Sequence, residues 1–211
     1  MNSTYERLHE LVISGELVPG ARLGDAHLAE ELGVSRPTVR EALRRLEAAD
    51  LAVSDGRSLR VARLDEGELR SALLMRASLE ALHAELAATR VADGEIAPSS
   101  LRRLRELADQ AERATNSGDT RAAVIGNRAF HQAIDALAES PVSAAAVDRL
   151  WDRILVATER SLVTAERREA VNQEHRALID ALATGDGTAA AEVASRHVRA
   201  TLEAATHVSQ R

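Results

Sequence analysis

Three histidines and one asparagine in the second half of the chain have the residue types and spacing of a metal site. Asn127 and His131 are four residues apart, which places them on one face of a predicted helix. His175 and His197 each fall within an apolar stripe of another predicted helix, so all three imidazoles are expected to point inward. Imidazole is the commonest protein ligand for divalent transition metals. The pattern predicts a metal site with these four residues as ligands, for zinc first and for nickel or manganese as alternatives.

The same histidines allow two other interpretations. A buried histidine is often a hydrogen-bonded core residue, so each could be structural and the chain an interaction module. A cluster with an open coordination position could also activate water, as in a metal-dependent enzyme. The sequence offers no well-placed general base beside the cluster, and an enzyme would leave the basic N-terminal segment unexplained.

A second set of residues has the chemistry of DNA recognition. Arg36 and Arg40 lie near the start of a helix predicted over residues 35–46, and an arginine can donate two hydrogen bonds to guanine in the major groove. Ser35 and Thr38 can donate to phosphates and fix the register of the helix on the duplex. The alternative is that an arginine stripe is only a solvated helix face.

Two more arginines follow in a predicted β-hairpin. The runs LAVSD and SLRVARL are β-prone and flank Gly56, which indicates two short strands joined by a turn. Arg57 and Arg60 in this hairpin, or wing, are expected to contact the DNA backbone or the minor groove.

Arg76 is a candidate for binding an effector. It shares a helix face with Leu79 and His83, and a guanidinium can hold a carboxylate through two hydrogen bonds. The alternative, which the sequence favours slightly, is a structural ion pair with Glu80, four residues further on. His83 could also enter the polar site.

The predicted elements that position these residues divide the chain into two domains. Helical spacing over residues 4–15, a short helix capped by Asp25, a turn at Gly33 and the helix that begins at Ser35 form a helix-turn-helix. With the wing, residues 1–63 are predicted to be a winged helix-turn-helix DNA-binding domain. Residues 64–211 are predicted to be an all-helical domain for effector binding and dimerisation, an antiparallel bundle. Its six helices are expected at about residues 65–92, 99–116, 119–139, 142–163, 166–184 and 187–207.

Composition supports a mainly α-helical, cytoplasmic protein. The chain has no cysteine and no long apolar run, so no membrane segment is expected. Its net charge is −6, yet residues 35–63 hold seven arginines against four acidic residues, which gives +3. A local basic patch therefore exists within an acidic protein.

The segment PGARLGDAHLAEELGVSRPTVREALRRLEAADL resembles the N-terminal signature of the GntR superfamily of bacterial transcription regulators. The segments RASLEALHAELAA, NRAFHQAI, EHRALIDAL and SRHVRATLE resemble the helical effector domain of its FadR/VanR branch, the FCD domain. The resemblance implies a homodimer on a palindromic operator, and a repressor released by a small carboxylate metabolite bound at the metal site.

The resemblance also implies an acidic first ligand, in the pattern Asp-x-x-x-His, where this chain has Asn127. An amide oxygen is neutral and a weaker ligand than a carboxylate. A divalent site with Asn127 would carry a net charge of +2 instead of +1, so we expect weaker metal retention together with stronger attraction for an anionic effector.

Overall fold

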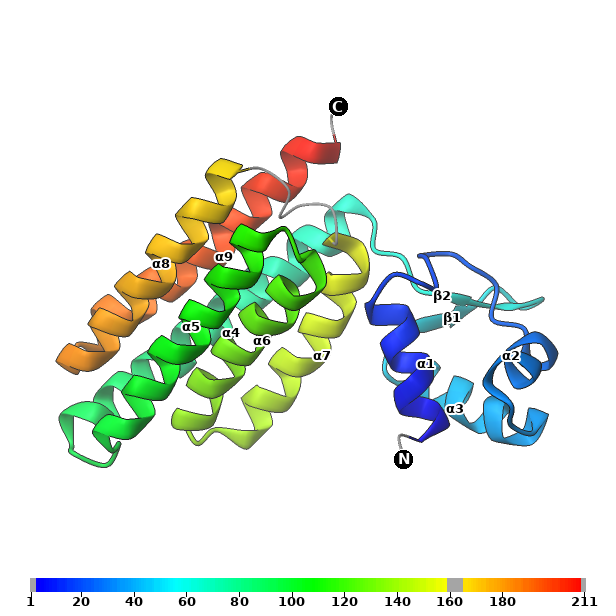
Figure 1. Ribbon diagram of the computed structural model, residues 1–211, viewed down its shortest axis with the longest axis horizontal. Coiled ribbons are helices and arrows are strands. Elements are labelled where there is room, and N and C mark those ends of the chain that lie inside the picture. The colour runs from blue at the N-terminus through cyan, green and yellow to red at the C-terminus, as the bar shows by residue number, and fades with distance from the viewer. Residues whose placement is uncertain (1–2, 159–164, 210–211) are drawn as a thin grey trace. The chain divides into compact units, whose positions relative to one another are not determined.

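The computed structural model describes residues 3–158 and 165–209 (Figure 1). These residues are mainly helical, with one small antiparallel sheet. Their contacts define two compact units, one of Met1–Leu69 with Asp152–Glu159 and one of Arg70–Trp151 with Arg160–Arg211. Within the described ranges, no helix is long and apolar enough to cross a membrane.

The first unit begins with a three-helix arrangement. Helix α1 spans Thr4–Ile13, α2 spans Asp25–Leu32 and α3 spans Arg36–Ala48. Gly33 ends α2 in the left-handed conformation, with φ of 66°, which allows the tight turn into α3. The helix-turn-helix predicted from the sequence is thus confirmed.

The expected cap of α2 is wrong in detail. Gly24 is the N-cap and makes no side-chain cap, while Asp25 is the first helical residue. The carboxylate of Asp25 turns instead toward two arginines of α3, Arg36 and Arg40. Asp25 therefore links α2 to α3.

Helix α3 begins as its sequence predicts. Ser35 is the N-cap, and its hydroxyl accepts a hydrogen bond from the Thr38 backbone N–H at 3.3 Å. Its apolar side chains form a buried face that packs into the core of the first unit: Val39, Ala42, Leu43 and Leu46. The arginines of α3 lie on the other faces and are exposed.

The predicted wing is also present. Strands β1, Ala52–Ser54, and β2, Leu59–Val61, pair antiparallel with Val53 opposite Arg60. The Asp55 carboxylate accepts hydrogen bonds from the backbone N–H groups of Arg57 and Ser58, which closes the turn between the strands.

Six helices of the described chain follow the wing, as predicted. They are α4 Glu66–Ala92, α5 Pro98–Ser117, α6 Thr120–Leu137, α7 Pro141–Thr158, α8 Ala165–Thr184 and α9 Gly187–Ser209. The predicted end of the fourth of these helices, at residue 163, falls among residues 159–164, which lie outside the described ranges. The predicted start of the next helix, at residue 166, is one residue after the observed start of α8. Alanines of α4 and α9 pack with leucines of α5 and α8 and with Phe130 of α6 to form the core. Small residues bring the helices close together around the polar residues described below.

Gly185 sets one of these close approaches. It follows α8 with a φ of +71°, and a Cβ built on it would lie 2.8 Å from the Ala92 Cβ at the end of α4. Only glycine fits both the backbone conformation and the space, so the α8–α9 turn rests directly on α4.

Candidate nucleic-acid interface and metal centre

The exposed face of α3 presents two arginines held by one carboxylate. Arg36 Nη2 donates to Asp25 Oδ1 at 3.0 Å and to Oδ2 at 3.2 Å, and Arg40 Nε lies 3.0 Å from Oδ2. The side chains of Arg36 and Arg40 are 58% and 56% exposed, against 25% for Asp25. Both arginines therefore remain accessible to a ligand while they share one anchor.

The hydroxyl groups predicted to contact phosphates lie at the N-terminus of α3. Ser35 Oγ and Thr38 Oγ1 are 2.7 Å apart and both side chains are exposed. The free N–H groups of a helix N-terminus attract anions, so this end of α3 has the chemistry of a phosphate contact.

The two wing arginines differ in their surroundings. Arg60 Nε donates to Asp55 Oδ2 at 3.1 Å and its Nη1 donates to the Gly20 carbonyl at 3.1 Å. Arg57 is exposed at the tip of the wing. Arg60 therefore braces the wing, and Arg57 is the freer of the two to contact a duplex.

In the second unit the three predicted histidines come together. His131 of α6, His175 of α8 and His197 of α9 each offer a ring nitrogen within 4.8 Å of the others, and each residue is 2% exposed. Their ring centroids are 5.0 to 5.4 Å apart. The prediction that these imidazoles converge is confirmed.

Atoms in and beside the cluster fit a bound cation. His131 Nε2, His175 Nε2 and Asn127 Oδ1 are buried and have no hydrogen-bond partner. Asn127 lies one helical turn before His131, as the predicted metal site requires. Buried polar atoms without partners are costly, and nitrogen and amide oxygen are both donors to divalent cations. These residues therefore suit a divalent transition metal.

Two of the histidines, His131 and His197, each contact a glutamate, and each of these glutamates forms an ion pair with an arginine. His131 Nδ1 lies 3.1 Å from Glu80 Oε2, and Arg76 Nε donates to Glu80 Oε1 at 2.6 Å. Burial opposes ionisation of Glu80, but the charges of Arg76 and His131 outweigh it and hold the pKa of this carboxyl below its usual value. The ionised Glu80 thus provides an ion-pair partner for His131 on the Nδ1 side of its ring.

The second such set joins α8 to α9. His197 Nδ1 lies 2.6 Å from Glu174 Oε2 and donates to it, and Arg167 Nη1 donates to both oxygens of Glu174 at 2.8 and 2.9 Å. Burial opposes ionisation of Glu174, and the hydrogen bonds from His197 and Arg167 prevail and lower its pKa. Carboxylates of this kind orient metal-ligating histidines in many proteins, because they accept a hydrogen bond from Nδ1–H and leave the unprotonated Nε2 free to bind the metal.

Sequence reasoning missed the roles of Glu174 and Arg167 and assigned Glu80 only to Arg76. The available signal was weak: Glu174 directly precedes His175 in the segment EHRALIDAL, and Arg167 lies seven residues before Glu174. Neither spacing identifies a contact with a histidine on another helix.

Burial keeps two of the imidazoles in the neutral form that binds metal. It lowers the pKa of His175 well below the usual value, and the nearby His197 and His131 lower it further. Burial also lowers the pKa of His197 to about 4, against the opposing hydrogen bond to Glu174. His175 and His197 therefore need little deprotonation at neutral pH before they can bind a metal.

The prediction that Arg76 binds an effector does not agree with its position. Arg76 is 2% exposed, pairs with Glu80 and lies with its Cζ atom 3.5 Å from the ring centroid of Trp151. The guanidinium is thus occupied by a carboxylate and an aromatic face. The structural alternative, an ion pair with Glu80, is the correct one.

His83 also lies outside the cluster. Its Nδ1 is 2.5 Å from Asp135 Oδ1 on α6 and its Nε2 is 2.7 Å from Ser143 Oγ on α7. Both ring nitrogens are engaged, so His83 connects three helices and is not available as a ligand.

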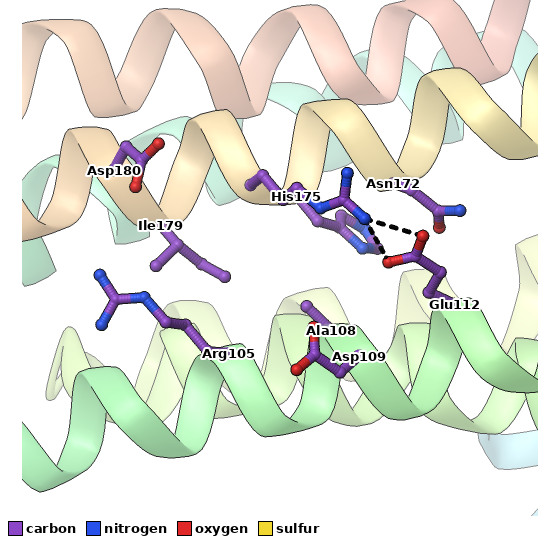
Figure 2. Close-up of a pocket in the computed structure, with 9 residues that line it drawn as sticks. Arg105, Ala108, Asp109, Glu112, Asn172, His175, Ile179 and Asp180 are labelled. Carbon is purple, nitrogen blue, oxygen red and sulfur yellow. Dashed lines mark hydrogen bonds and ion pairs between the residues drawn. The ribbon is translucent and has the colours of Figure 1, made fainter.

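A cavity of about 230 Å³ between α5 and α8 is lined in part by His175, one of the three clustered histidines (Figure 2). Its lining combines charged, polar and apolar side chains: Arg105, Ala108, Asp109, Glu112, Asn172, His175, Arg176, Ile179 and Asp180. Arg176 Nη2 donates to both oxygens of Glu112 across the cavity, at 2.6 and 2.7 Å. Because His175 belongs to both the cavity and the cluster, a small molecule in this cavity would lie next to the histidines.

A winged helix-turn-helix unit joined to a helical unit with a buried polar site defines a class of DNA-binding regulators. The family model "Bacterial regulatory proteins, gntR family" matches residues 1–61, and the model of the FCD domain matches residues 71–200, more than half of the chain. The chain belongs to the GntR family of bacterial regulatory proteins, among those that carry an FCD domain.

Individual relatives agree with this assignment. The HTH-type transcriptional regulator McbR of Escherichia coli K12 is 33% identical over 171 residues, which cover 79% of this chain and 75% of McbR. The "Probable D-xylose utilization operon transcriptional repressor" of Paenarthrobacter nicotinovorans is 29% identical over 201 residues, 93% of this chain and 84% of the relative. The solved structure of E. coli McbR/YncC has a TM-score of 0.83 at 27% identity and covers 99% of both chains. The protein is thus a transcriptional regulator of the GntR family, and neither the family models nor these relatives support the metal-dependent enzyme alternative.

Proposed function

We propose that the protein is a ligand-responsive repressor that binds a palindromic DNA operator as a homodimer and is released by a small carboxylate bound beside a metal ion. The observation that carries the ligand-responsive part is the buried cluster of His131, His175 and His197, of which His175 also lines the cavity between α5 and α8. A purely structural core would satisfy these imidazoles with hydrogen bonds, whereas two of them have an unpartnered Nε2.

At the DNA, α3 would lie in the major groove. Its exposed arginines Arg36 and Arg40 would contact base edges, while Ser35 and Thr38 would contact phosphates at the N-terminus of the helix. Arg57 and Arg60 would add backbone contacts through the wing. A homodimer would place two such helices on the two halves of the operator.

In the bundle, Asn127, His131, His175 and His197 would hold the metal, with zinc as the first candidate. A bound divalent ion would supply a positive charge that attracts an anionic ligand. Glu80 and Glu174 orient the rings of His131 and His197 through Nδ1, and burial keeps His175 and His197 neutral.

The α5–α8 cavity provides a place for the effector. Arg105 of its lining can hold a carboxylate, whereas Arg176 is paired with Glu112 and Arg76 is paired with Glu80 beneath Trp151. A cavity of about 230 Å³ suits a small metabolite. Such a ligand would shift the population of domain arrangements away from those that fit the operator.

Metal analysis tests the bundle site. The full chain is purified, its metal content measured, and zinc affinity determined by competition with a chromophoric chelator for the wild type, His175→Ala and Asn127→Asp. We expect one ion per chain, loss of binding in His175→Ala, and tighter binding in Asn127→Asp because a carboxylate replaces a neutral amide. If the aspartate does not tighten binding, Asn127 is not a ligand.

Operator binding tests the DNA side. Arg36→Ala and Arg40→Ala should abolish binding to an operator selected in vitro without loss of helical content by circular dichroism. Retained operator binding by both variants would contradict the assignment of α3. Sedimentation of the free protein and of the complex measures the expected homodimer, and a screen of small carboxylates with zinc should reveal one that lowers operator affinity.

A further inference from the structure

Asp25 sits where a negative charge is least expected, at the surface that is to face DNA. It is the first residue of α2, makes no cap for that helix, and contacts Arg36 and Arg40 of α3 at 3.0 Å each. A carboxylate here repels the phosphates of any duplex and so weakens non-specific binding. The role of Asp25 at this surface must therefore be something other than raising the affinity for DNA.

The contacts of Asp25 leave different donors free on the two arginines. Arg40 forms an ion pair with Asp25 through Nε, 3.0 Å from Oδ2, and its guanidinium carries two further amino groups that can donate to a base. Guanine offers N7 and O6, which accept two hydrogen bonds from one guanidinium. Arg36 contacts both oxygens through one terminal amino group, Nη2. The two arginines thus share one carboxylate, Arg36 through a terminal amino group and Arg40 through Nε.

We propose that Asp25 is a specificity-determining residue, which holds Arg36 and Arg40 in fixed orientations so that they recognise bases instead of binding any phosphate. The inference rests on the proposed function, in which α3 enters the major groove. Asp25 acts through the arginines and is a positioning residue. Exposed arginines without an anchor adopt many rotamers and reach phosphates from most of them, whereas anchored arginines bind well only where the matching bases lie.

Removing the carboxylate should consequently change two affinities in opposite directions. Affinity for a duplex of unrelated sequence should rise, because one negative charge is gone. Affinity for the operator should fall or stay level, because the arginines lose their orientation. The ratio of the two affinities therefore isolates the positioning role, since a purely electrostatic role would raise both affinities together.

The experiment compares the full-length wild type with Asp25→Ala, Asp25→Asn, Asp25→Glu and the control Glu30→Ala. Glu30 is exposed on the same helix and its loss changes the net charge equally. An operator is selected from random duplexes with the wild type, and dissociation constants for it and for a scrambled duplex are measured at one salt concentration. Each variant also undergoes its own selection.

We expect Asp25→Ala and Asp25→Asn to lower the ratio of operator to scrambled affinity at least tenfold and to lose sequence preference at the guanine positions. Asp25→Glu should restore part of the ratio, and Glu30→Ala should change it less than twofold. Circular dichroism checks folding, and Asp25→Asn, which keeps the shape of the side chain, supports the test if Asp25→Ala is unstable.

Two failures are distinguishable. If the wild type enriches no sequence, recognition by α3 is wrong and the inference falls with it. If the wild type enriches an operator and both Asp25 variants keep the wild-type ratio and the same motif, the proposed function stands and the role of Asp25 is overturned.

Discussion

Two glutamates, Glu80 and Glu174, lie next to Nδ1 of His131 and His197 and so influence which ring nitrogen is left to bind a ligand. Glu174 accepts a hydrogen bond from Nδ1–H of His197, and Glu80 Oε2 lies 3.1 Å from Nδ1 of His131, so Nε2 remains as the candidate metal ligand of each ring. Glu80 is buried and Glu174 is partly buried, and each stays ionised because an arginine pairs with it: Arg76 for Glu80 and Arg167 for Glu174. The geometry of the proposed metal site therefore depends on charged residues that are not themselves proposed ligands.

Glu174→Gln tests this dependence. The amide cannot hold the Nδ1 proton as strongly and leaves Arg167 without its anion, so zinc affinity should fall by about 10- to 100-fold. Chelator competition measures the affinity, and circular dichroism confirms that the helices persist. Glu169→Gln, at an exposed position on the same helix, is the control and should bind zinc like the wild type. Unchanged affinity in Glu174→Gln would show that this carboxylate does not orient His197.

Asp135 should make the metal-free protein less stable as pH rises. Burial raises the pKa of its carboxyl, the hydrogen bond from His83 opposes this, and the charge of Glu80 adds to the rise, while that of His131 opposes it. The folded state therefore binds the proton more tightly than the unfolded state. The stability that this contributes is full below the unfolded pKa of about 3.9 and is lost as pH rises through the folded pKa.

Urea unfolding from pH 4 to pH 8 in the presence of chelator measures this effect. The stability of the wild type relative to Asp135→Asn should fall as pH increases across the interval between the two pKa values. In a His83→Gln background the fall should extend to higher pH, because His83 no longer lowers the pKa of Asp135. Asp93→Asn, exposed just after α4, serves as the reference. A difference between wild type and Asp135→Asn that is independent of pH would contradict the assignment.

At the scale of elements, glycine fixes how the turn between α8 and α9 meets α4. Gly185 adopts a φ of +71° and lies against Ala92, while Gly118 adopts a φ of +78° at the end of α5, where a Cβ would have no atom within 4 Å. The two positions share the backbone conformation and differ in the space around it. They therefore separate the cost of the conformation from the cost of crowding.

Gly118→Ala should lower the free energy of unfolding by about 1 kcal/mol, the cost of a left-handed non-glycine residue. Gly185→Ala should cost about 1–3 kcal/mol more, because its Cβ would meet Ala92 at 2.8 Å and force the packed helices apart. Denaturant unfolding of both variants measures the difference. Equal losses would mean that the α8–α9 turn yields to the extra methyl group.

At the scale of the whole molecule, metal binding should raise the free energy of unfolding. Any ligand that binds only the folded state adds RT ln(1 + [L]/Kd), about 2.7 kcal/mol at a hundredfold excess over Kd. For a chain of this size about 1 kcal/mol shifts the unfolding temperature by 2–4 °C, so zinc should raise it by about 5–10 °C.

Differential scanning calorimetry of the full chain with zinc and with chelator measures this shift. His175→Ala should lose it, while His27→Ala, whose histidine is exposed on α2, should keep it. A shift of equal size in His175→Ala would place the bound zinc elsewhere in the molecule.

Much of this architecture could be predicted from local sequence patterns. The N-cap at Ser35, the left-handed Gly33 and the helical spacing around His131 and His175 each act within one or two turns, so the helices and their inward faces follow from neighbouring residues. Contacts between helices do not. Asp25 pairs with Arg36 and Arg40, which are 11 and 15 residues away along the chain, and His83 pairs with a residue that is 52 away. Spacing along one helix cannot reveal such pairs. For the same reason Arg76 looked available, since Trp151 closes over it from a distant helix.

The α4–α6 contact contains two acid–imidazole pairs of opposite polarity, one turn apart. Glu80 of α4 faces His131 of α6, and His83 of α4 faces Asp135 of α6. A slide of α6 by one turn in one direction would set Asp135 against Glu80, and in the other direction His131 against His83. Both displaced registers place like groups opposite each other, so only the observed register of α4 and α6 pairs each acid with an imidazole. In the proposed ligand-responsive regulator, a ligand at the cluster would therefore shift this contact in a discrete step and not by gradual sliding.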